Sequence, residues 1–314
     1  MKQGLGLLLV ACAGCAASGP VTVTPRRVVD RGAAEAAVRK IVQAEYAAME
    51  KPDPDAWAAS FAPDSFFFGA RPDEAMPSRA LAVAEMHKRT DAMAKAGGSF
   101  AVRSTALQLG LAGDSRAAWV SDVLEVTLTV GAKQDTQSLR VTEVLAEQDG
   151  SWWVLALHWS VALPNERALE LAAQKKLGPL PEVAESIEPG AQALAAEFLK
   201  STVEVGEFLT SLSQRPDAFI FGTAPDEQIL GGPQIHDAFA KQIEQHHLTI
   251  ARRGGLRAGV TPSGSVGWVA ANLELGAVTD GKKVRVPTRG LMVYLNENGL
   301  WKLVQGHFSN GVTE

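Results

Sequence analysis

Residues 63–74 read PDSFFFGARPDE and residues 216–227 read PDAFIFGTAPDE, so eight of the twelve positions are identical at an offset of 153. A second match joins residues 150–160 to residues 299–309 at an offset of 149. That offset also relates three single residues of each copy, namely Trp119, Glu125 and Arg140 with Trp268, Glu274 and Arg289. The order is kept, and the period is far longer than the roughly 20–50 residues of solenoid repeats. The sequence therefore predicts two tandem copies of one whole domain.

The N-terminus resembles a bacterial lipoprotein signal peptide over residues 1–15. A positive start precedes a short apolar run, which is too short to span a bilayer as a helix. Leu9 lies three positions before Cys12, as lipoprotein signals prefer, whereas Cys15 follows a better pair of small residues and leaves no stray thiol. Lipidation is expected at Cys15 or Cys12, and an ordinary secretory peptide is the alternative. Residues 16–32 are expected to form a tether.

These features predict a protein that is secreted across the inner membrane and lipid-anchored, on the outer membrane facing the periplasm. No cysteine follows Cys15, and two domains of about 130 residues can each bury a sufficient core without a disulfide. The net charge is -5 and no basic patch with interleaved aromatics occurs, which argues against a nucleic-acid partner. No later segment has the length of a membrane helix.

Each copy begins with helical patterning and ends with strand patterning. In copy one, helices are expected over about residues 33–50 and from Ser78 to Gly97-Gly98. The period then changes to two, which predicts strands over residues 100–111, 118–130, 136–146 and 151–161. Copy two repeats the plan, with helices over about residues 192–209 and 233–245 and strands between residues 248 and 312. Helices first and long strands afterwards indicate an α+β fold.

Each copy resembles a SnoaL-like domain of the nuclear transport factor 2-like superfamily. The resemblance rests on the long opening helix, the Phe-Gly-x-x-Pro-Asp-Glu segment, Trp-Val on a middle strand, Arg on the next strand, and a closing Gly-x-Trp…His-aromatic-Ser strand. It implies two tandem cone-shaped domains, each a strongly curved antiparallel sheet wrapped over a long N-terminal helix plus shorter helices. The expected boundaries are 33–163 for domain 1, 164–189 for a helix and a proline-containing linker, and 190–314 for domain 2.

Family members include isomerases, dehydratases, cyclases and non-catalytic modules, so the fold does not decide the activity. The superfamily's ketosteroid isomerases use a tyrosine and aspartates in the cone. Here Tyr46 and Tyr294 fall at non-matching positions, so those roles carry onto no residue. Histidine spacing does not suit a metal site, and no phosphate loop or dinucleotide fingerprint occurs. We therefore expect neither a metal nor a cofactor.

The candidate site is the set of polar residues that both copies keep. Strand alternation predicts that His158 and His307 point into the cones, where a histidine with a carboxylate partner could move protons near neutral pH. The catalytic candidates are His158, His307, Glu125 and Glu274. The ligand-binding candidates are Arg140, Arg289, His158, His307, Trp119, Trp268, Asp73 and Asp226. In the alternative interpretation, the groups satisfy one another in a buried network, and Asp73 and Asp226 belong to capped turns.

The tandem arrangement predicts that the two sheets pack on each other within one chain, which gives a monomeric pseudo-dimer. The apolar face expected at this contact comprises Trp153, Leu155, Leu157, Trp159 and Val161, with Val304, Gly306 and Phe308 as partners. Two independent domains on a flexible linker are the alternative. For function, the sequence favours a membrane-anchored, non-enzymatic module that binds a small apolar or acidic ligand or a partner protein. The alternative is an isomerase, dehydratase or hydrolase that uses a cone-lining histidine as general acid or base.

Overall fold

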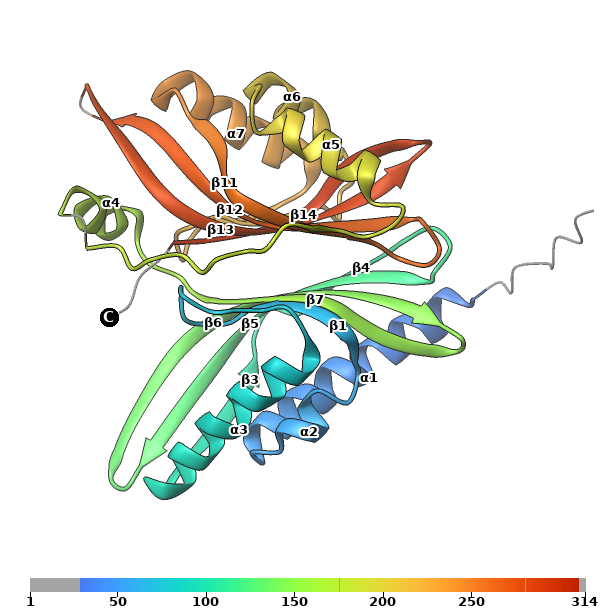
Figure 1. Ribbon diagram of the computed structural model, residues 1–314, viewed down its shortest axis with the longest axis vertical. Helices are drawn as coiled ribbons and strands as arrows, with labels where there is room; N and C mark the ends of the chain where they lie inside the picture. The colour runs from blue at the N-terminus through green and yellow to red at the C-terminus, as the bar shows by residue number, and fades with distance from the viewer. Residues whose placement is uncertain (1–28, 175, 280, 311–314) are drawn as a thin grey trace, which may run out of the picture.

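The computed structural model describes residues 29–174, 176–279 and 281–310. The predicted signal peptide, with Cys12 and Cys15, lies outside the described residues. Within the described ranges, no helix combines the length and the apolar character that a membrane crossing requires. The chain forms two domains of the same plan, joined by a segment that lies against the second domain (Figure 1).

Three helices cover one side of domain 1, namely α1 (Arg31–Glu50), α2 (Pro54–Trp57) and α3 (Arg79–Lys95). The side chain of Asp30 caps α1 by accepting a hydrogen bond from a backbone N–H of the first turn. Ser78 caps α3 in the same way, as the sequence predicted. The buried stripe of α1 packs against the sheet and forms the core of the domain.

The sheet of domain 1 has the strand order β2-β1-β7-β6-β5-β3, with β4 paired to β5. Its neighbours are antiparallel except for β1 and β7, which run parallel. The strands are β1 (Phe61–Phe68), β2 (Ala75–Met76), β3 (Gly98–Ser104), β4 (Gln108–Leu111), β5 (Ala117–Val130), β6 (Lys133–Gln148) and β7 (Ser151–Val161). The strand expected over residues 100–111 is split into β3 and β4, because the Ala106 N–H donates to the Asp122 carboxylate instead of to a neighbouring strand.

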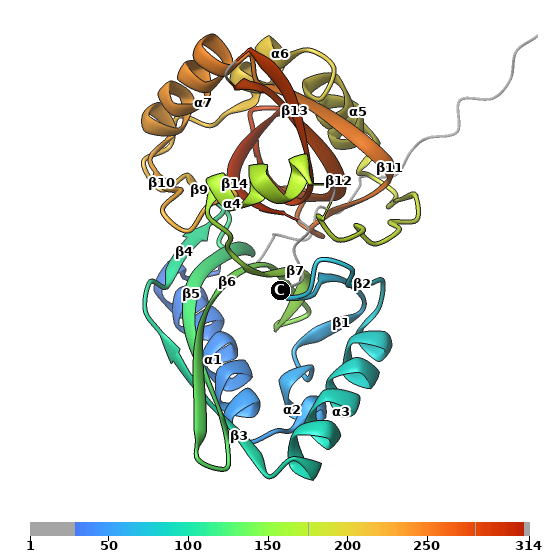
Figure 2. The ribbon, with the colours of Figure 1, turned by 90° about the vertical axis from the view of Figure 1, so that its left-hand side faces the viewer.

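Domain 2 repeats this plan, and Figure 2 shows both domains from the side. Its helices are α5 (Gln192–Ser201), α6 (Val205–Ser211) and α7 (Gly232–His246), so the single helix expected over residues 192–209 is two. Its sheet has the order β10-β9-β14-β13-β12-β11-β8, in which β8 (Ser186–Ile187) comes from the connecting segment. The strands are β9 (Phe219–Phe221), β10 (Gln228–Leu230), β11 (Thr249–Val260), β12 (Val266–Thr279), β13 (Lys282–Glu297) and β14 (Leu300–Asn310). The predicted α+β class with two tandem copies is confirmed.

The connecting segment packs along the sheet of domain 2. It contains α4 (Asn165–Ala173) and the short strand β8 (Ser186–Ile187), which pairs parallel to β11. Asn272 of β12 donates a 2.6 Å hydrogen bond to the Pro181 carbonyl, and Val183 is buried between the domains. These contacts hold the proline-containing stretch in place.

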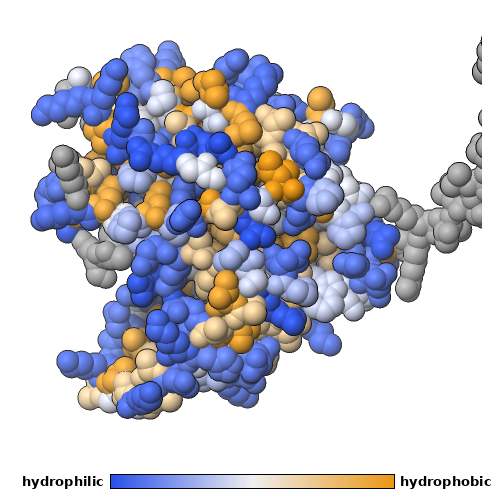
Figure 3. Space-filling model, viewed as in Figure 1, coloured by the Kyte–Doolittle hydropathy of each residue, from blue (hydrophilic) through white to orange (hydrophobic). Residues whose placement is uncertain are grey.

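The two sheets lie face to face across the middle of the molecule, and the helices cover their outer sides (Figures 1 and 2). One buried apolar cluster takes members from both sheets, among them Phe66, Trp119, Val144, Trp268, Leu291 and Val304. The rings of Phe66 and Trp268 stack across the contact with centroids 6.4 Å apart. The surface in Figure 3 is largely hydrophilic with small scattered apolar areas, in keeping with apolar sheet faces that are turned toward each other.

Candidate functional site

The repeated Phe-Gly-x-x-Pro-Asp-Glu segment forms a turn that holds an arginine of the other domain. In domain 1, the carbonyls of Gly69, Arg71 and Glu74 accept hydrogen bonds from Arg289 at 3.0, 2.7 and 3.3 Å. The guanidinium also lies 5.3 Å from the ring centroid of Phe68. The turn itself is closed by Glu74, whose carboxylate accepts from the Arg71 N–H. The repeated motif therefore builds a receptor for a cation of the partner domain.

The equivalent turn of domain 2 holds Arg140 of domain 1 in the same way. The carbonyls of Gly222 and Ala224 accept from Arg140 at 2.6 and 3.3 Å, and the Phe221 ring lies 5.4 Å below its guanidinium. The Glu227 carboxylate closes this turn by accepting from the Ala224 N–H. Arg140 is 2% and Arg289 is 1% exposed, so neither guanidinium can meet an acidic ligand from solution. Burial lowers the pKa of each to about 10, and both stay charged at neutral pH.

His158 and His307 meet at the centre of the same contact. Their rings stack with centroids 3.9 Å apart and planes 16° apart. His158 Nε2 lies 2.9 Å from the Ser309 hydroxyl, and His307 Nε2 lies 2.7 Å from the Ser160 hydroxyl. Because Arg140 and Arg289 donate to these hydroxyl oxygens, each serine must donate its own proton to the histidine. Both rings are therefore bonded as neutral imidazoles.

The surroundings keep the two histidines uncharged. Burial is the main reason why the pKa of His158 lies well below its usual value, and the positive charges of Arg289 and Arg140 lower this pKa further. Burial likewise lowers the pKa of His307, with additional repulsion from His158 and from the same two arginines. The arrangement stabilises the contact between the sheets and offers no solvent-accessible base.

The predicted orientation of these histidines into the cones is wrong. A β-bulge shifts the register of β6 and β7 between Val144 and Leu145, so Leu155 has no partner on β6. Strict alternation is therefore broken at Leu155. Beyond the bulge, Leu157 and Trp159 face the cone instead of the partner domain, whereas the histidine and serine face outward. Leu155 and Val304 do pack in the contact cluster, as expected.

The remaining candidates also lie outside the cones. Glu125 and Glu274 sit on the outer faces of the sheets, where they pair with Arg103 and Arg253, respectively. Trp119 and Trp268 belong to the cluster between the sheets. Asp73 and Asp226 are exposed on the two turns, and Asp73 pairs with Arg71 at 2.9 Å. None of these side chains joins the histidines in a catalytic arrangement.

A cavity opens instead at the wide end of the cone of domain 1. Its volume is about 220 Å³. Its apolar lining includes Met49, Trp57, Met86, Phe100, Leu139 and Trp159. The polar lining residues include Asp53, Asp135 and Arg89, whose guanidinium is bonded to Glu74 and Glu85. The cavity therefore suits an apolar molecule, because its arginine is already neutralised by two carboxylates.

A cluster of acids lies inside the same cone. Glu45 on α1 is 2% exposed and accepts a 2.7 Å hydrogen bond from Ser60. Glu143 on β6 and Asp122 on β5 are both fully buried. The second Glu45 oxygen, both Glu143 oxygens and the Tyr46 hydroxyl have no hydrogen-bond partner among the described residues. Buried polar groups without partners are uncommon in folded proteins and need an explanation.

Glu45 and Glu143 are close enough to affect each other's protonation, and so are Tyr46 and Asp122, although their atoms fall short of hydrogen-bond geometry. Burial is the main cause that raises the pKa of Glu45 well above its usual value, and the charge of Glu143 adds to it. Burial also raises the pKa of Glu143 to about 7, with a contribution from Asp122. The Tyr46 pKa is raised by burial and by all three carboxylates, which places its hydroxyl among them. Asp122 accepts from the Ser104 hydroxyl and the Ala106 N–H.

Domain 2 lacks this cluster. At the offset of 149, Ala271 and Met292 stand where domain 1 has Asp122 and Glu143, and both belong to the apolar core of domain 2. At the offset of 153, Phe198 and Leu199 replace Glu45 and Tyr46. The cluster lies outside the predicted site because only one of the two copies carries its acids, whereas the predicted site comprises residues that both copies keep. The sequence signal that could have found the cluster is a difference between the copies: domain 1 has a carboxylate at positions where domain 2 has an apolar core residue.

Among the described residues, no group of three or more histidine, cysteine, aspartate or glutamate side chains could hold a metal ion. The acid cluster instead combines three carboxylates with a tyrosine hydroxyl.

Sequence and structure comparisons give the family context. The sequence model of the SnoaL-like domain matches residues 38–164 and 193–313. No curated protein sequence matches the chain. A nuclear transport factor 2-like protein of unknown function from Pseudomonas putida is similar in structure, with 21% sequence identity and a TM-score of 0.37. The match covers 42% of the present chain and 89% of the Pseudomonas protein. A protein with a cystatin-like fold from Caulobacter vibrioides is 16% identical with a TM-score of 0.37, covering 46% of this chain and 99% of its own.

Proposed function

Because the chain belongs to the SnoaL-like domain family, which matches it twice, we propose that it is a membrane-anchored, non-enzymatic module whose domain 1 binds a small, mainly apolar ligand. The observation that carries the proposal is the cavity of about 220 Å³ at the wide end of the first cone. An apolar cavity of about 150 Å³ in another protein holds benzene. On that scale, this cavity is large enough for a molecule of two fused rings.

Domain 2 acts in this proposal as a structural partner. Its cone is packed with its own large side chains, including Phe198, Phe208, Met292 and Tyr294. Its sheet covers the outer face of the domain 1 sheet and receives Arg140 in the second turn. Such a packed second copy would hold the curved sheet of the first copy open around a ligand without binding one itself.

The binding proposal can be tested by isothermal titration calorimetry with indane, an uncharged probe of two fused rings. We expect one site per chain. Val126 lines the cavity, so Val126→Trp fills it and should abolish binding. The matched control is Leu275→Trp, which alters the equivalent position of domain 2 and should leave binding intact. Indane binding that survives Val126→Trp but is lost in Leu275→Trp would place the site in domain 2 and overturn the proposal.

Membrane anchoring rests on the N-terminal sequence. We propose that a lipid on Cys15 or Cys12 holds the protein at the outer membrane, with residues 16–32 as a tether. Metabolic labelling with a radioactive fatty acid tests this. The label should be lost in Cys15→Ser or in Cys12→Ser, and the variant that loses it identifies the modified residue. Label retained in the double variant would exclude lipidation at either cysteine.

We also propose that the mature protein is a monomer, because each chain already joins two sheets. The reciprocal arginine contacts and the shared apolar cluster occupy the faces through which two such domains would otherwise associate. Light scattering coupled to size-exclusion chromatography should give the mass of one chain. A dimer at micromolar concentration would contradict this part of the proposal.

A second candidate function is acid–base catalysis in the first cone. The observation that favours it is the Glu143 carboxyl on the cone side of β6, whose pKa is raised by burial to about 7 and suits proton transfer at neutral pH, although a substrate would have to open a path to this enclosed side chain. The histidines of the earlier hypothesis are enclosed between the sheets and cannot serve. Turnover of a bound ligand that is lost in Glu143→Gln, with ligand binding retained, would support this candidate over simple binding.

A further inference from the structure

The cavity of domain 1 and the contact between the domains are joined by one pair of side chains. Arg89 on α3 lines the cavity, and its guanidinium bonds to Glu74 of the first turn (residues 69–74) and, at 3.2 Å, to Glu85. The backbone carbonyl of the same Glu74 accepts from Arg289 at 3.3 Å. Burial lowers the pKa of Arg289 to about 10, and the charge of Glu74 opposes this shift. One glutamate therefore lies between an arginine of the cavity wall and an arginine of domain 2.

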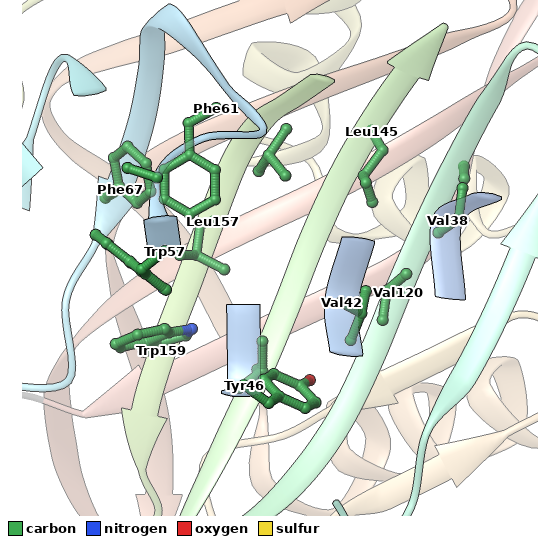
Figure 4. Packing of buried hydrophobic residues seen from close by; sticks show 14 of the residues in the cluster. Val38, Val42, Tyr46, Trp57, Phe61, Phe67, Val120, Leu145, Leu157 and Trp159 are labelled. Carbon is green, nitrogen blue, oxygen red and sulfur yellow. The ribbon is translucent and has the colours of Figure 1, made fainter. Parts of the chain in front are cut away.

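A small recess extends the cavity toward the first turn. Its volume is about 10 Å³, and it shares four lining residues with the cavity, namely Trp57, Met86, Arg89 and Trp159. Figure 4 shows Trp57 and Trp159 near Phe67, which also lines the recess. Phe68 and Gly69 complete the approach to the turn, and the Phe68 ring lies 5.3 Å from the Arg289 guanidinium and 5.2 Å from the His158 ring. The space inside the cone thus reaches side chains that contact domain 2.

The equivalent turn of domain 2 is held from a different side. At the offset of 153, Gln242 stands where domain 1 has Arg89. The Glu227 carboxylate accepts instead from Asn165 of the connecting segment at 2.7 Å and from the Thr223 hydroxyl at 3.3 Å. The two turns receive their arginines alike and differ in what holds the glutamate, so the molecule contains its own matched comparison.

Solvent screens this chain of contacts mainly at its cavity end. The side chain of Arg89 is 30% exposed, that of Glu74 is 11% exposed, and Arg289 is 1% exposed. An apolar ligand beside Arg89 displaces solvent from the guanidinium, and its attraction to Glu74 grows because the local dielectric constant falls. A carboxylate that is held more firmly keeps the turn closed, since it also accepts from the Arg71 N–H at 3.2 Å.

We propose that a ligand in the first cone tightens the contact between the domains, with Arg89 and Glu74 as the positioning residues that connect the two sites. This inference rests on the proposed binding function and adds its regulation. The coupling is reciprocal, because a ligand that favours the docked domains is itself bound more tightly when Arg289 occupies the first turn. Loss of Arg289 should therefore weaken ligand binding, although this residue belongs to domain 2 and lies outside the cavity lining.

The first test measures the affinity for indane by calorimetry in two equivalent variants. Arg289→Met removes the arginine from the first turn and should weaken indane binding about fivefold or more, as expected for two coupled sites. Arg140→Met removes the arginine from the second turn and is the matched control, which should leave the affinity unchanged. In an Arg89→Met background, Arg289→Met should no longer affect the affinity, because the connecting guanidinium is gone.

The second test uses the unaltered protein and does not depend on the folding of a variant. Within the first turn, the Gly69 N–H donates to the Glu74 carbonyl, and the Glu74 N–H donates to the Arg71 carbonyl. Hydrogen exchange at these two amides, followed by NMR, should slow in saturating indane. The slowing should be about fivefold or more greater than at the equivalent amides of Gly222 and Glu227 in the second turn.

The outcomes separate this inference from the binding proposal. If Arg289→Met binds indane as tightly as the parent, the cone and the contact are independent, so the coupling is wrong and the binding function stands. Equal losses in Arg289→Met and Arg140→Met would also overturn the coupling, because they would report a general loosening of the protein. If Arg289→Met does not fold, the exchange comparison decides, and an equal response of the two turns overturns the inference. If indane does not bind to the parent, the binding function itself fails.

Discussion

His158 and His307 occupy equivalent positions in the two copies, and each ring bonds to the serine that follows the other histidine by two residues. This crossed arrangement explains why both copies keep the same polar set. Each copy supplies an arginine, a serine and a histidine to a network that neither could complete alone. The polar residues that both copies keep therefore form the contact between the domains, whereas the residues that differ between the copies lie in the cone.

Removal of either buried arginine should destabilise the protein strongly. Arg289 bonds to three carbonyls of the first turn, and Arg289→Met would remove that donor from each, although the Arg71 and Glu74 carbonyls keep a backbone donor. The free energy of unfolding should fall by about 2–3 kcal/mol, as measured by chemical denaturation, because several hydrogen bonds to a charged group are lost. Arg289→Lys should rescue little, because an ammonium cannot reproduce the fork of the guanidinium. Arg103→Met, at an exposed pair, is the control and should change stability by less than about 1 kcal/mol.

The histidine pair predicts acid sensitivity. The pKa of each ring is lowered in the folded protein, whereas the unfolded chain takes up protons below a pKa of about 6.5. Stability from this pair is therefore complete above about pH 6.5 and is lost as the pH falls, by up to about 1.4 kcal/mol per pH unit for each ring. The double variant His158→Gln, His307→Gln should lack this slope. Parallel stability curves for the variant and the parent between pH 5 and 7 would contradict the prediction.

The acid cluster predicts the opposite dependence. The pKa of Glu143 is raised to about 7, against about 4.3 in an unfolded chain, so folding becomes less favourable as the pH rises between these values. Glu143→Met should therefore stabilise the protein by about 1–4 kcal/mol near pH 8 and by less near pH 5. Thermal unfolding at the two pH values measures the difference. A variant that is less stable than the parent at pH 8 would show that the carboxylate has a structural role.

Domain 1 alone should self-associate. Without domain 2, the apolar outer face of its sheet, which includes Phe66, Trp119 and Val144, would be exposed to water. A chain that ends at residue 163 should therefore elute as a dimer or larger species in size-exclusion chromatography, whereas a chain that also contains domain 2 should elute as a monomer. Replacement of Val144 by Lys in the truncated chain should reduce the association. A truncated chain that is monomeric and stable would mean that the second domain is not needed to cover the first.

The sequence by itself determined the number of domains, the fold class and most helices and strands. The repeat is long and ordered, and hydrophobic periodicity is a local property that can be seen without tertiary structure. It also marked the residues that join the domains, since both copies keep them.

Only the tertiary structure decided which way these residues face. One bulge in each domain, opposite the Val144–Leu145 step and the Val293–Tyr294 step, reverses the sides of the closing strand, and no local pattern marks it. The structure also gathered Glu45, Asp122 and Glu143 from one helix and two strands into the cone. Their separation in the chain hides this meeting, because burial and electrostatic coupling depend on the packing of distant segments.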